Sequence, residues 1–157
     1  MPSPLGATTG VAIASAINTS ALSLSGRVNF GKDDLRFMVV DGNLGRYVGL
    51  NFDNDAVIDG TGHFKAINGH GGFIALRHVW GGTWRSNASW AYETYDNDTA
   101  LTGTAVGRSS SSWTLNLLYS PFPKLDVGGE YRHAKRTLET GHSGSLDRLE
   151  FTTKYSF

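Results

Sequence analysis

The sequence of 157 residues lacks cysteine, which excludes disulfide bonds and thiolate metal sites. An excess of charge of one sign is also missing, because 14 Lys and Arg balance 14 Asp and Glu and the formal net charge is zero. That balance argues against a nucleic-acid binder and against a polybasic membrane anchor. No apolar run approaches the roughly 18 residues that a membrane-spanning helix needs. No signal peptide is expected either, because no basic residue precedes the apolar stretch 11–17.

Glycine and aromatic residues, in contrast, are well represented, with 20 glycines and 11% aromatics. A length of 157 residues allows one domain, or part of one. Transmembrane β-barrels have this kind of composition and no long apolar runs, because apolar and polar residues alternate along their strands. The missing apolar runs therefore do not exclude a membrane protein that crosses with strands.

Apolar and polar residues alternate with a period of two in seven segments, which is typical of strands with one apolar and one polar face. The predicted strands are 21–30, 35–40, 74–80, 85–93, 113–119, 125–132 and 148–157. Short turns are expected at 31–34, 81–84 and 120–124, and long polar connections at about 41–70, 96–110 and 136–146. Outer-membrane barrels sort their connections in this way, with short periplasmic turns and long extracellular loops.

The predicted faces differ sharply in charge, since the apolar faces carry almost none. No further strands or amphipathic helix are available to cover the apolar faces, so lipid is expected to cover them. Aromatic residues gather near both strand ends, as in two interfacial girdles: Trp80, Trp84, Tyr119, Phe122, Tyr155 and Phe157 by the short turns, and Tyr92, Tyr95, Trp113 and Tyr131 towards the long connections. The predicted fold is all-β, an antiparallel up-and-down transmembrane β-barrel, with about seven strands present as part of a larger barrel.

The last strand, Arg148-Leu-Glu-Phe-Thr-Thr-Lys-Tyr-Ser-Phe157, resembles the C-terminal strand of Gram-negative outer-membrane porins. In those porins the alternating hydrophobics and the final aromatic are read by the barrel-assembly machinery, and Phe151, Tyr155 and Phe157 would carry this signal here. Further segments are similar to the DcaP-like trimeric porins: Leu24-Ser-Gly-Arg27, Gly42-Asn-Leu-Gly-Arg-Tyr47, Asn51-Phe-Asp-Asn-Asp55, Arg85-Ser-Asn87, Lys135-Arg-Thr-Leu-Glu139 and Gly144-Ser-Leu-Asp-Arg148. The resemblance covers about residues 20–157. It implies a homotrimeric channel of the bacterial outer membrane that passes small anionic solutes such as dicarboxylates.

Porins of that family are longer than this chain, begin with a signal peptide and carry an N-terminal helical segment. We therefore expect the chain to be the C-terminal part of a porin, with Met1 an internal or artificial start. Residues 1–20 are expected to form remaining loop, a weak strand or a short helix over 11–18. Residues 21–157 are expected to form the barrel portion.

The charged residues of the polar faces are the candidate pore-lining residues. They are Arg27, Arg36, Arg77, Arg85, Glu93, Glu130, Arg132, Arg148, Glu150 and Lys154. The arginines would either attract anionic solutes or pair with the carboxylates, including Asp126, to hold the wall together. In the long connection after the second strand, Asp53, Asp55, Asp59 and Lys65 are candidates for a constriction loop, with a solvated surface loop as the alternative.

No enzymatic or metal site is predicted, and no cofactor. The five histidines have no metal-ligand spacing, and Asp53-Asn-Asp55 lacks the glycine and distal glutamate of a calcium loop. The serines show no nucleophile elbow. The leading hypothesis is a passive porin in contact with outer-membrane lipid. A structural or adhesive barrel without transport, and a soluble β-sheet binding module, are the alternatives.

Overall fold

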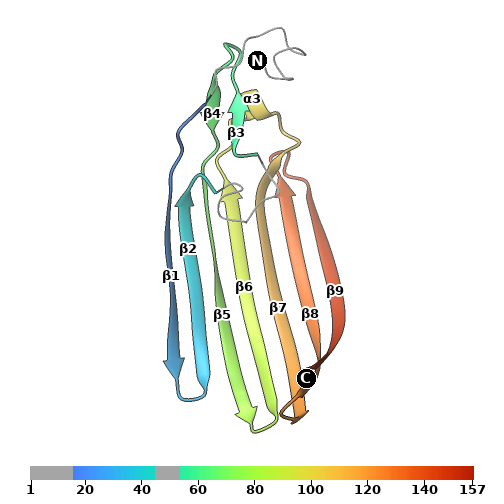
Figure 1. The fold of residues 1–157 in the computed structure, drawn as a ribbon. Helices are drawn as coiled ribbons and strands as arrows, with labels where there is room; N and C mark the ends of the chain where they lie inside the picture. Colours follow the sequence, from blue (N-terminus) through green and yellow to red (C-terminus); the bar gives the residue numbers. More distant parts are fainter. Residues whose placement is uncertain (1–15, 45–53) are drawn as a thin grey trace.

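The computed structural model describes residues 16–44 and 54–157, and its main feature is one antiparallel sheet of seven strands (Figure 1). The strands are β1 (Ala21–Phe30), β2 (Asp33–Gly42), β5 (Gly69–Gly81), β6 (Trp84–Tyr95), β7 (Gly107–Phe122), β8 (Leu125–Leu138) and β9 (Ser143–Tyr155). Each pairs with the next in that order, so the chain runs up and down across the sheet. The predicted all-β class and the antiparallel arrangement are confirmed.

Three small elements were not predicted from the period of the sequence. β3 (Ala56–Ile58) and β4 (Phe64–Ala66) form a separate hairpin, and α3 (Thr99–Thr102) is a single helical turn. All three lie at the end of the sheet that is opposite to the C-terminus (Figure 1). Within the described residues, no helix is long and apolar enough to cross a membrane.

The structure corrects the predicted connections. The last one, expected to be long over about 136–146, spans only residues 139–142, where Gly141 adopts φ +84°. β7 also begins earlier than expected, at Gly107, because Ser109–Ser112 offers no contrast between apolar and polar residues. Those serines nevertheless pair with β6 on one side and β8 on the other. The long connections are therefore those over 43–68 and 96–106.

The segment before β1 is described only in part. Residues 16–20 have no regular secondary structure, and residues 1–15, which include most of the short helix considered over 11–18, lie outside the described residues. β1 itself begins at Ala21.

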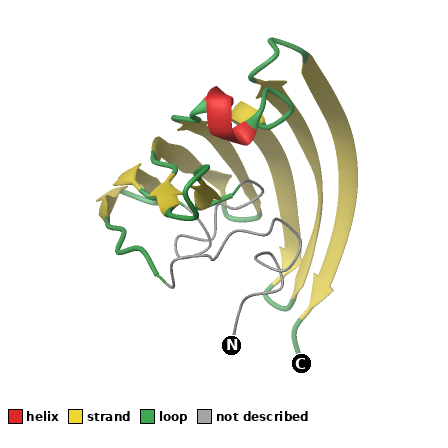
Figure 2. Ribbon diagram, turned by 90° about the horizontal axis from the view of Figure 1, so that it is seen from above, coloured by secondary structure: helices red, strands yellow, loops and turns green. Residues whose placement is uncertain are grey.

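The sheet is bent into an open trough (Figure 2). A cavity of about 1100 Å³ touches side chains from β2 at one side of the sheet to β9 at the other. One cavity can reach such distant strands only on the concave side. Because directly paired residues of neighbouring strands point to the same face, the register assigns every paired side chain to the concave or the convex face.

The convex face is mainly apolar. One continuous row across all seven strands consists of Val28, Leu35, Leu76, Ala88, Leu115, Tyr131 and Leu149. This face is not as free of charge as expected, since it also carries Asp33, Asp41, Lys135 and Asp147. Two of these carboxylates are satisfied locally. Asp33 accepts from the Val79 backbone N–H at 2.8 Å and contacts His78, and Asp147 accepts from Tyr131 and contacts His133.

A small hydrophobic core lies at the end of the sheet with the long connections. Val40 and Tyr95 on the concave face pack with Leu44 and Ile67, which flank the β3–β4 hairpin in sequence. Val57 of β3 packs against the same group. The amide of Asn43 donates to the carbonyl oxygens of Asp55 and Ile67 at 2.8 Å. The base of the connection over 43–68 is thus fastened onto the concave side of the sheet.

Candidate functional site

The concave face gathers all ten candidate pore-lining residues. Two neighbouring rows of the register carry most of them. The first is Asn29, Asp34, Arg77, Asn87, Asn116, Glu130 and Glu150, and the second is Arg27, Arg36, Ala75, Ser89, Thr114, Arg132 and Arg148. Arg85, Glu93 and Lys154 lie on the same face in other rows. A polar wall therefore crosses the whole sheet.

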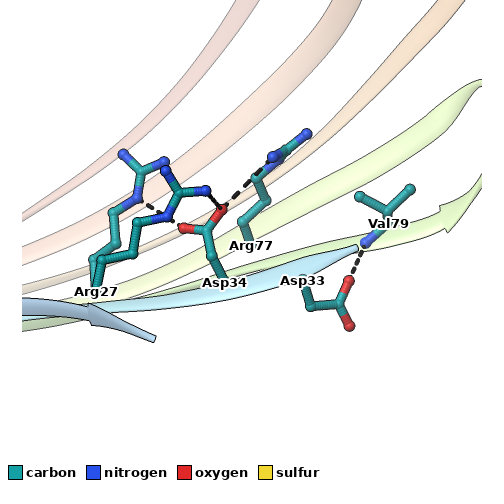
Figure 3. A network of polar contacts seen from close by, with 6 residues as sticks. Arg27, Asp33, Asp34, Arg77 and Val79 are labelled. Atoms are coloured by element: carbon teal, nitrogen blue, oxygen red, sulfur yellow. Dashed lines mark hydrogen bonds and ion pairs between the residues drawn. The ribbon is translucent and has the colours of Figure 1, made fainter. Parts of the chain in front are cut away.

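Asp34 is the centre of the largest ion-pair cluster on this wall (Figure 3). Its carboxylate is almost fully buried, with 1% of the side chain exposed. Arg36 Nε lies 2.7 Å from one carboxylate oxygen, and Arg27 Nη2 and Arg77 Nη1 lie 3.1 and 3.6 Å from the other. Three guanidinium groups therefore share one carboxylate, which leaves this part of the wall positive.

The partner of these three arginines differs from the partners that the sequence suggests. The sequence pattern places Asp34 in a turn and offers the carboxylates of the later strands as partners. Two of those carboxylates do pair with arginine: Asp126 with Arg85 at 2.9 Å, and Glu150 with Arg148 at 2.8 Å. The other two accept from neutral groups. Glu93 accepts from the Ser110 hydroxyl at 2.6 Å, and Glu130 from the Asn116 amide at 3.3 Å.

Arg132 stands apart from the other arginines of its row. Its Nε is buried and, within residues 16–44 and 54–157, has no hydrogen-bond partner. The side chain lines the 1100 Å³ cavity. A buried donor without a partner carries a desolvation cost, and this nitrogen has almost no accessible surface of its own. Among the described residues, Arg132 and Arg136 are the two arginines whose residues line the cavity.

The paired residues of the concave face carry more positive than negative charge. Eight basic side chains face five carboxylates: Arg27, Arg36, Arg77, Arg85, Arg132, Arg136, Arg148 and Lys154, against Asp34, Glu93, Asp126, Glu130 and Glu150. Although the whole sequence is neutral, its charges are thus unequally distributed. A water-filled space over this face would have a positive potential.

The candidate constriction-loop residues are not brought together. Asp53 lies outside the described residues, and Asp55 precedes β3, where its backbone carbonyl accepts from Asn43 and Ile67. Asp59 closes the β3–β4 turn by accepting from Thr61 and His63. Lys65 reaches out of its own connection to Asp98 at the start of α3, 2.7 Å away. This ion pair links the two long connections.

One candidate carboxylate, Asp59, and the partner of Lys65, Asp98, are held in their charged form. Hydrogen bonds from the Thr61 hydroxyl and from the backbone of His63 and Thr61 lower the pKa of Asp59 to about 2. The hydrogen bond from Lys65 lowers the pKa of Asp98 below its ordinary value. Asp98 also accepts from the Ala100 backbone N–H and so caps α3.

Sequence reasoning missed four residues of the concave face: Asp34, Met38, Phe73 and Leu146. Asp34 was assigned to a turn. It lies two residues before Arg36, however, and residues two apart on a strand share a face, so the sequence could have predicted that the two side chains are neighbours. Met38 fell on the polar side of the predicted strand 35–40, whereas Phe73 and Leu146 lay outside the predicted strands, because β5 and β9 begin earlier than expected, at Gly69 and Ser143. Among the described residues, no group of three or more His, Cys, Asp or Glu could hold a metal ion.

Comparison with known proteins finds neither a matching family model nor a matching curated protein. The structure is similar to the crystal structure of the outer membrane channel DcaP of Acinetobacter baumannii, with a TM-score of 0.77 and 16% sequence identity. The match covers 87% of this chain and 40% of the channel. The predicted resemblance to DcaP-like porins is thereby confirmed at the level of the fold: the seven-stranded sheet has the architecture of part of that channel's wall.

Proposed function

We propose that the chain is the C-terminal portion of an outer-membrane porin, a passive diffusion channel for small anionic solutes without enzymatic activity. The observation that carries the proposal is the division of the sheet into a charged concave face and an apolar convex face. A wall of this kind suits an aqueous lumen on one side and lipid on the other.

The proposal includes the surroundings of the channel. The bacterial outer membrane would cover the convex face, a homotrimer is the assembly implied by the resemblance, and Phe151, Tyr155 and Phe157 would serve as the signal for the barrel-assembly machinery. Dicarboxylates are the solutes that the resemblance implies. The excess of basic over acidic side chains on the concave face supports a preference for anions.

The connection over 43–68 would narrow the lumen in this proposal. Support comes from its base, where Leu44 and Ile67 pack onto the concave side of β2 and β6 through Val40 and Tyr95. Asp53, Asp55, Asp59 and Lys65 would be the charged groups that solutes meet on entering.

The test is the reversal potential of the reconstituted protein in planar lipid bilayers under a KCl gradient. We expect a conducting channel that prefers chloride. Arg132→Gln should reduce the preference, whereas Asp41→Asn, which changes one charge on the convex face of β2 outside the cavity lining, should leave it unchanged. A closed, non-conducting protein would favour a structural or adhesive barrel, and equal effects of the two substitutions would remove the assigned role of the concave face.

A further inference from the structure

The apolar band of the convex face runs obliquely across the sheet. Its exposed large side chains lie within residues 22–30 on β1 and within residues 149–157 at the other edge, on β9 and just after it. The midpoints of these two stretches are Gly26 and Thr153. The register, however, puts Asp147 in the row of Gly26. From β1 to β9 the centre of the band is therefore displaced toward the short turns, from residue 147 to residue 153.

This displacement is the one expected for tilted strands in a barrel wall. The six residues between the two positions rise about 20 Å along a strand, and the six steps from β1 to β9 span about 29 Å across the sheet. The band is thus inclined at about 35° to the register rows, and strands of outer-membrane barrels are tilted by about 35–45°. A level parallel to the membrane therefore moves about one residue toward the short turns at each strand.

The basic side chains of the concave face regroup along such a level. The level that starts at Arg27 on β1 passes through Arg77 on β5 and Lys154 on β9. Arg36 on β2 and Arg85 on β6 lie within one residue of it. These residues belong to different register rows, yet all of them lie beside the centre of the apolar band. They would therefore share one height, halfway through the membrane.

Two carboxylates lie at this level, and basic groups outnumber each of them. Asp34 holds three arginines (Figure 3). Asp126 pairs with Arg85 at 2.9 Å and lies directly opposite Lys154. The level thus carries five basic and two acidic side chains. This difference of three equals the whole excess of the eight basic over the five acidic side chains on the paired concave face.

The other charged residues of this face lie nearer to the long connections, and their charges cancel. They are Arg132, Arg136, Arg148, Glu93, Glu130 and Glu150. Arg148 shows the contrast most clearly, because it lies on the same strand and face as Lys154 but pairs with Glu150 at 2.8 Å. About 20 Å of strand separates Arg148 from Lys154.

We infer that Arg85 and Lys154 form one selectivity filter together with Arg27, Arg36 and Arg77, a positively charged belt halfway through the membrane. The inference rests on the proposed function and assigns its anion preference to one level of the lumen. An excess of fixed positive charge at that level lowers the electrostatic cost for an anion that passes it. Charges further out act weakly on this level, because the Debye length is about 10 Å at 0.1 M salt.

The first test compares Lys154→Gln with Arg148→Gln, since each removes one positive charge from the same face of the same strand. Reversal potentials under a KCl gradient give the chloride-to-potassium permeability ratio of the reconstituted protein. At about 0.1 M salt we expect Lys154→Gln to lower this ratio about twofold or more, and Arg148→Gln to lower it clearly less. Lys154→Arg keeps the charge and should retain the ratio of the unchanged protein.

The outcomes separate the belt from the proposed function. An effect of Arg148→Gln that equals or exceeds that of Lys154→Gln, in a protein that prefers chloride, overturns the belt and leaves the proposed function standing. An unchanged protein that conducts without preferring chloride overturns the anion preference of the proposed function, and the belt with it.

A second test measures the tilt itself and needs no current. Because the sequence has no cysteine, Leu24→Cys, Phe151→Cys and Ser145→Cys can each carry a single nitroxide label on the convex face. Accessibility of the label to oxygen and to a water-soluble nickel complex gives its depth in phospholipid vesicles. We expect equal depths at Leu24 and Phe151, and a label nearer the headgroups at Ser145, although Ser145 shares a register row with Leu24. Equal depths at Leu24 and Ser145 would overturn the inference whatever the protein conducts.

Discussion

Asp34 sets how much positive charge the concave wall presents. A single carboxylate holds Arg27, Arg36 and Arg77, whose side chains remain between 40% and 52% exposed. Charged hydrogen bonds of this kind fix the direction of each guanidinium group. The cluster therefore combines a structural role for the carboxylate with open faces of three cations.

Under the proposed function, Asp34→Asn is expected to increase the preference for anions and to loosen the wall. The substitution removes one negative charge and leaves three guanidinium groups to repel one another. In a water-filled lumen the change in the chloride-to-potassium permeability ratio should be on the order of two- to threefold, and it should shrink at high salt because the charges are screened. Reversal potentials at low and high KCl measure it.

A matched control is Asn29→Asp, which adds a negative charge in the same row of the wall. It should shift the permeability ratio in the opposite direction. Identical ratios for Asp34→Asn and the unchanged protein would show that solutes do not sense this cluster.

At the level of single residues, the sequence predicted on which face of the sheet a side chain lies, but not which side chain it contacts. Alternation was sufficient to place Arg27 and Arg36 on one face, because a strand admits only two. It could not identify Asp34 as their partner, since that contact depends on the register between strands. For the same reason the sequence could not show that the buried Nε of Arg132 has no hydrogen-bond partner among the described residues.

At the scale of elements, the β3–β4 hairpin shows how a long connection becomes part of the wall. Its outer turn is closed by Asp59, and its base by Asn43 and the packing of Leu44 and Ile67. Lys65 joins it to the next connection through Asp98. These contacts hold the connection at the rim of the trough, which a simple solvated loop would not require.

Ile67→Ala should release the base of this hairpin. Ile67 is 4% exposed, and truncation of a buried isoleucine to alanine costs about 2–5 kcal/mol. We expect faster amide hydrogen exchange over residues 54–68, with little change in β7–β9. Ile58→Ala, on the other face of β3 from Val57, serves as the control and should have a smaller effect. Equal protection in all three proteins would show that the cluster does not anchor the connection.

The turn of the hairpin should lose stability as the pH falls from about 4 to about 2. The pKa of Asp59 is about 2, below its ordinary value of 3.8. A carboxyl group with a lowered pKa stabilises the folded form above its unfolded pKa, and this contribution disappears as the pH falls from about 4 to about 2. A carbon-13 NMR titration of the Asp59 carboxyl measures its pKa. The amide of His63 should lose protection over the same interval, and Asp59→Asn should remove that pH dependence.

The seven long strands were predictable because each carries enough alternating residues to reveal a period of two. The hairpin was not, since β3 and β4 have only three residues each. The serines near the start of β7 show no alternation of apolar and polar residues, so the predicted strand began six residues late, at Trp113. The turn after Leu138 was overestimated because Gly141, Ser143 and Gly144 read as loop residues while the pairing of β8 with β9 continues.

At the scale of the whole molecule, the division into two faces determines what surrounds the sheet. The convex side exposes large apolar side chains over every strand, from Leu22 and Leu24 at one edge to Leu149 and Phe151 at the other. Such a continuous apolar surface exceeds what a protein in water usually exposes. The free-energy cost of exposing this apolar surface is lowest when lipid covers it.

Phe151→Arg should therefore destabilise the protein in a bilayer far more than Thr152→Arg. Phe151 lies within the apolar band of the convex face and is 81% exposed, whereas Thr152 lies on the concave face of the same strand. An arginine at the midplane of the lipid-facing side costs about 2–4 kcal/mol. Urea unfolding from phospholipid vesicles measures both variants, and a similar loss in each would contradict the assignment of the faces.

The number of strands has a consequence for how the wall is completed. With seven strands in strict alternation, β1 and β9 run in the same direction (Figure 1). In a closed antiparallel barrel, every strand runs opposite to both of its neighbours. The additional strands that connect β9 back to β1 must therefore be odd in number. If copies of this sheet were joined edge to edge, β9 of one copy would lie parallel to β1 of the next. A barrel made only of such copies would therefore not be antiparallel throughout.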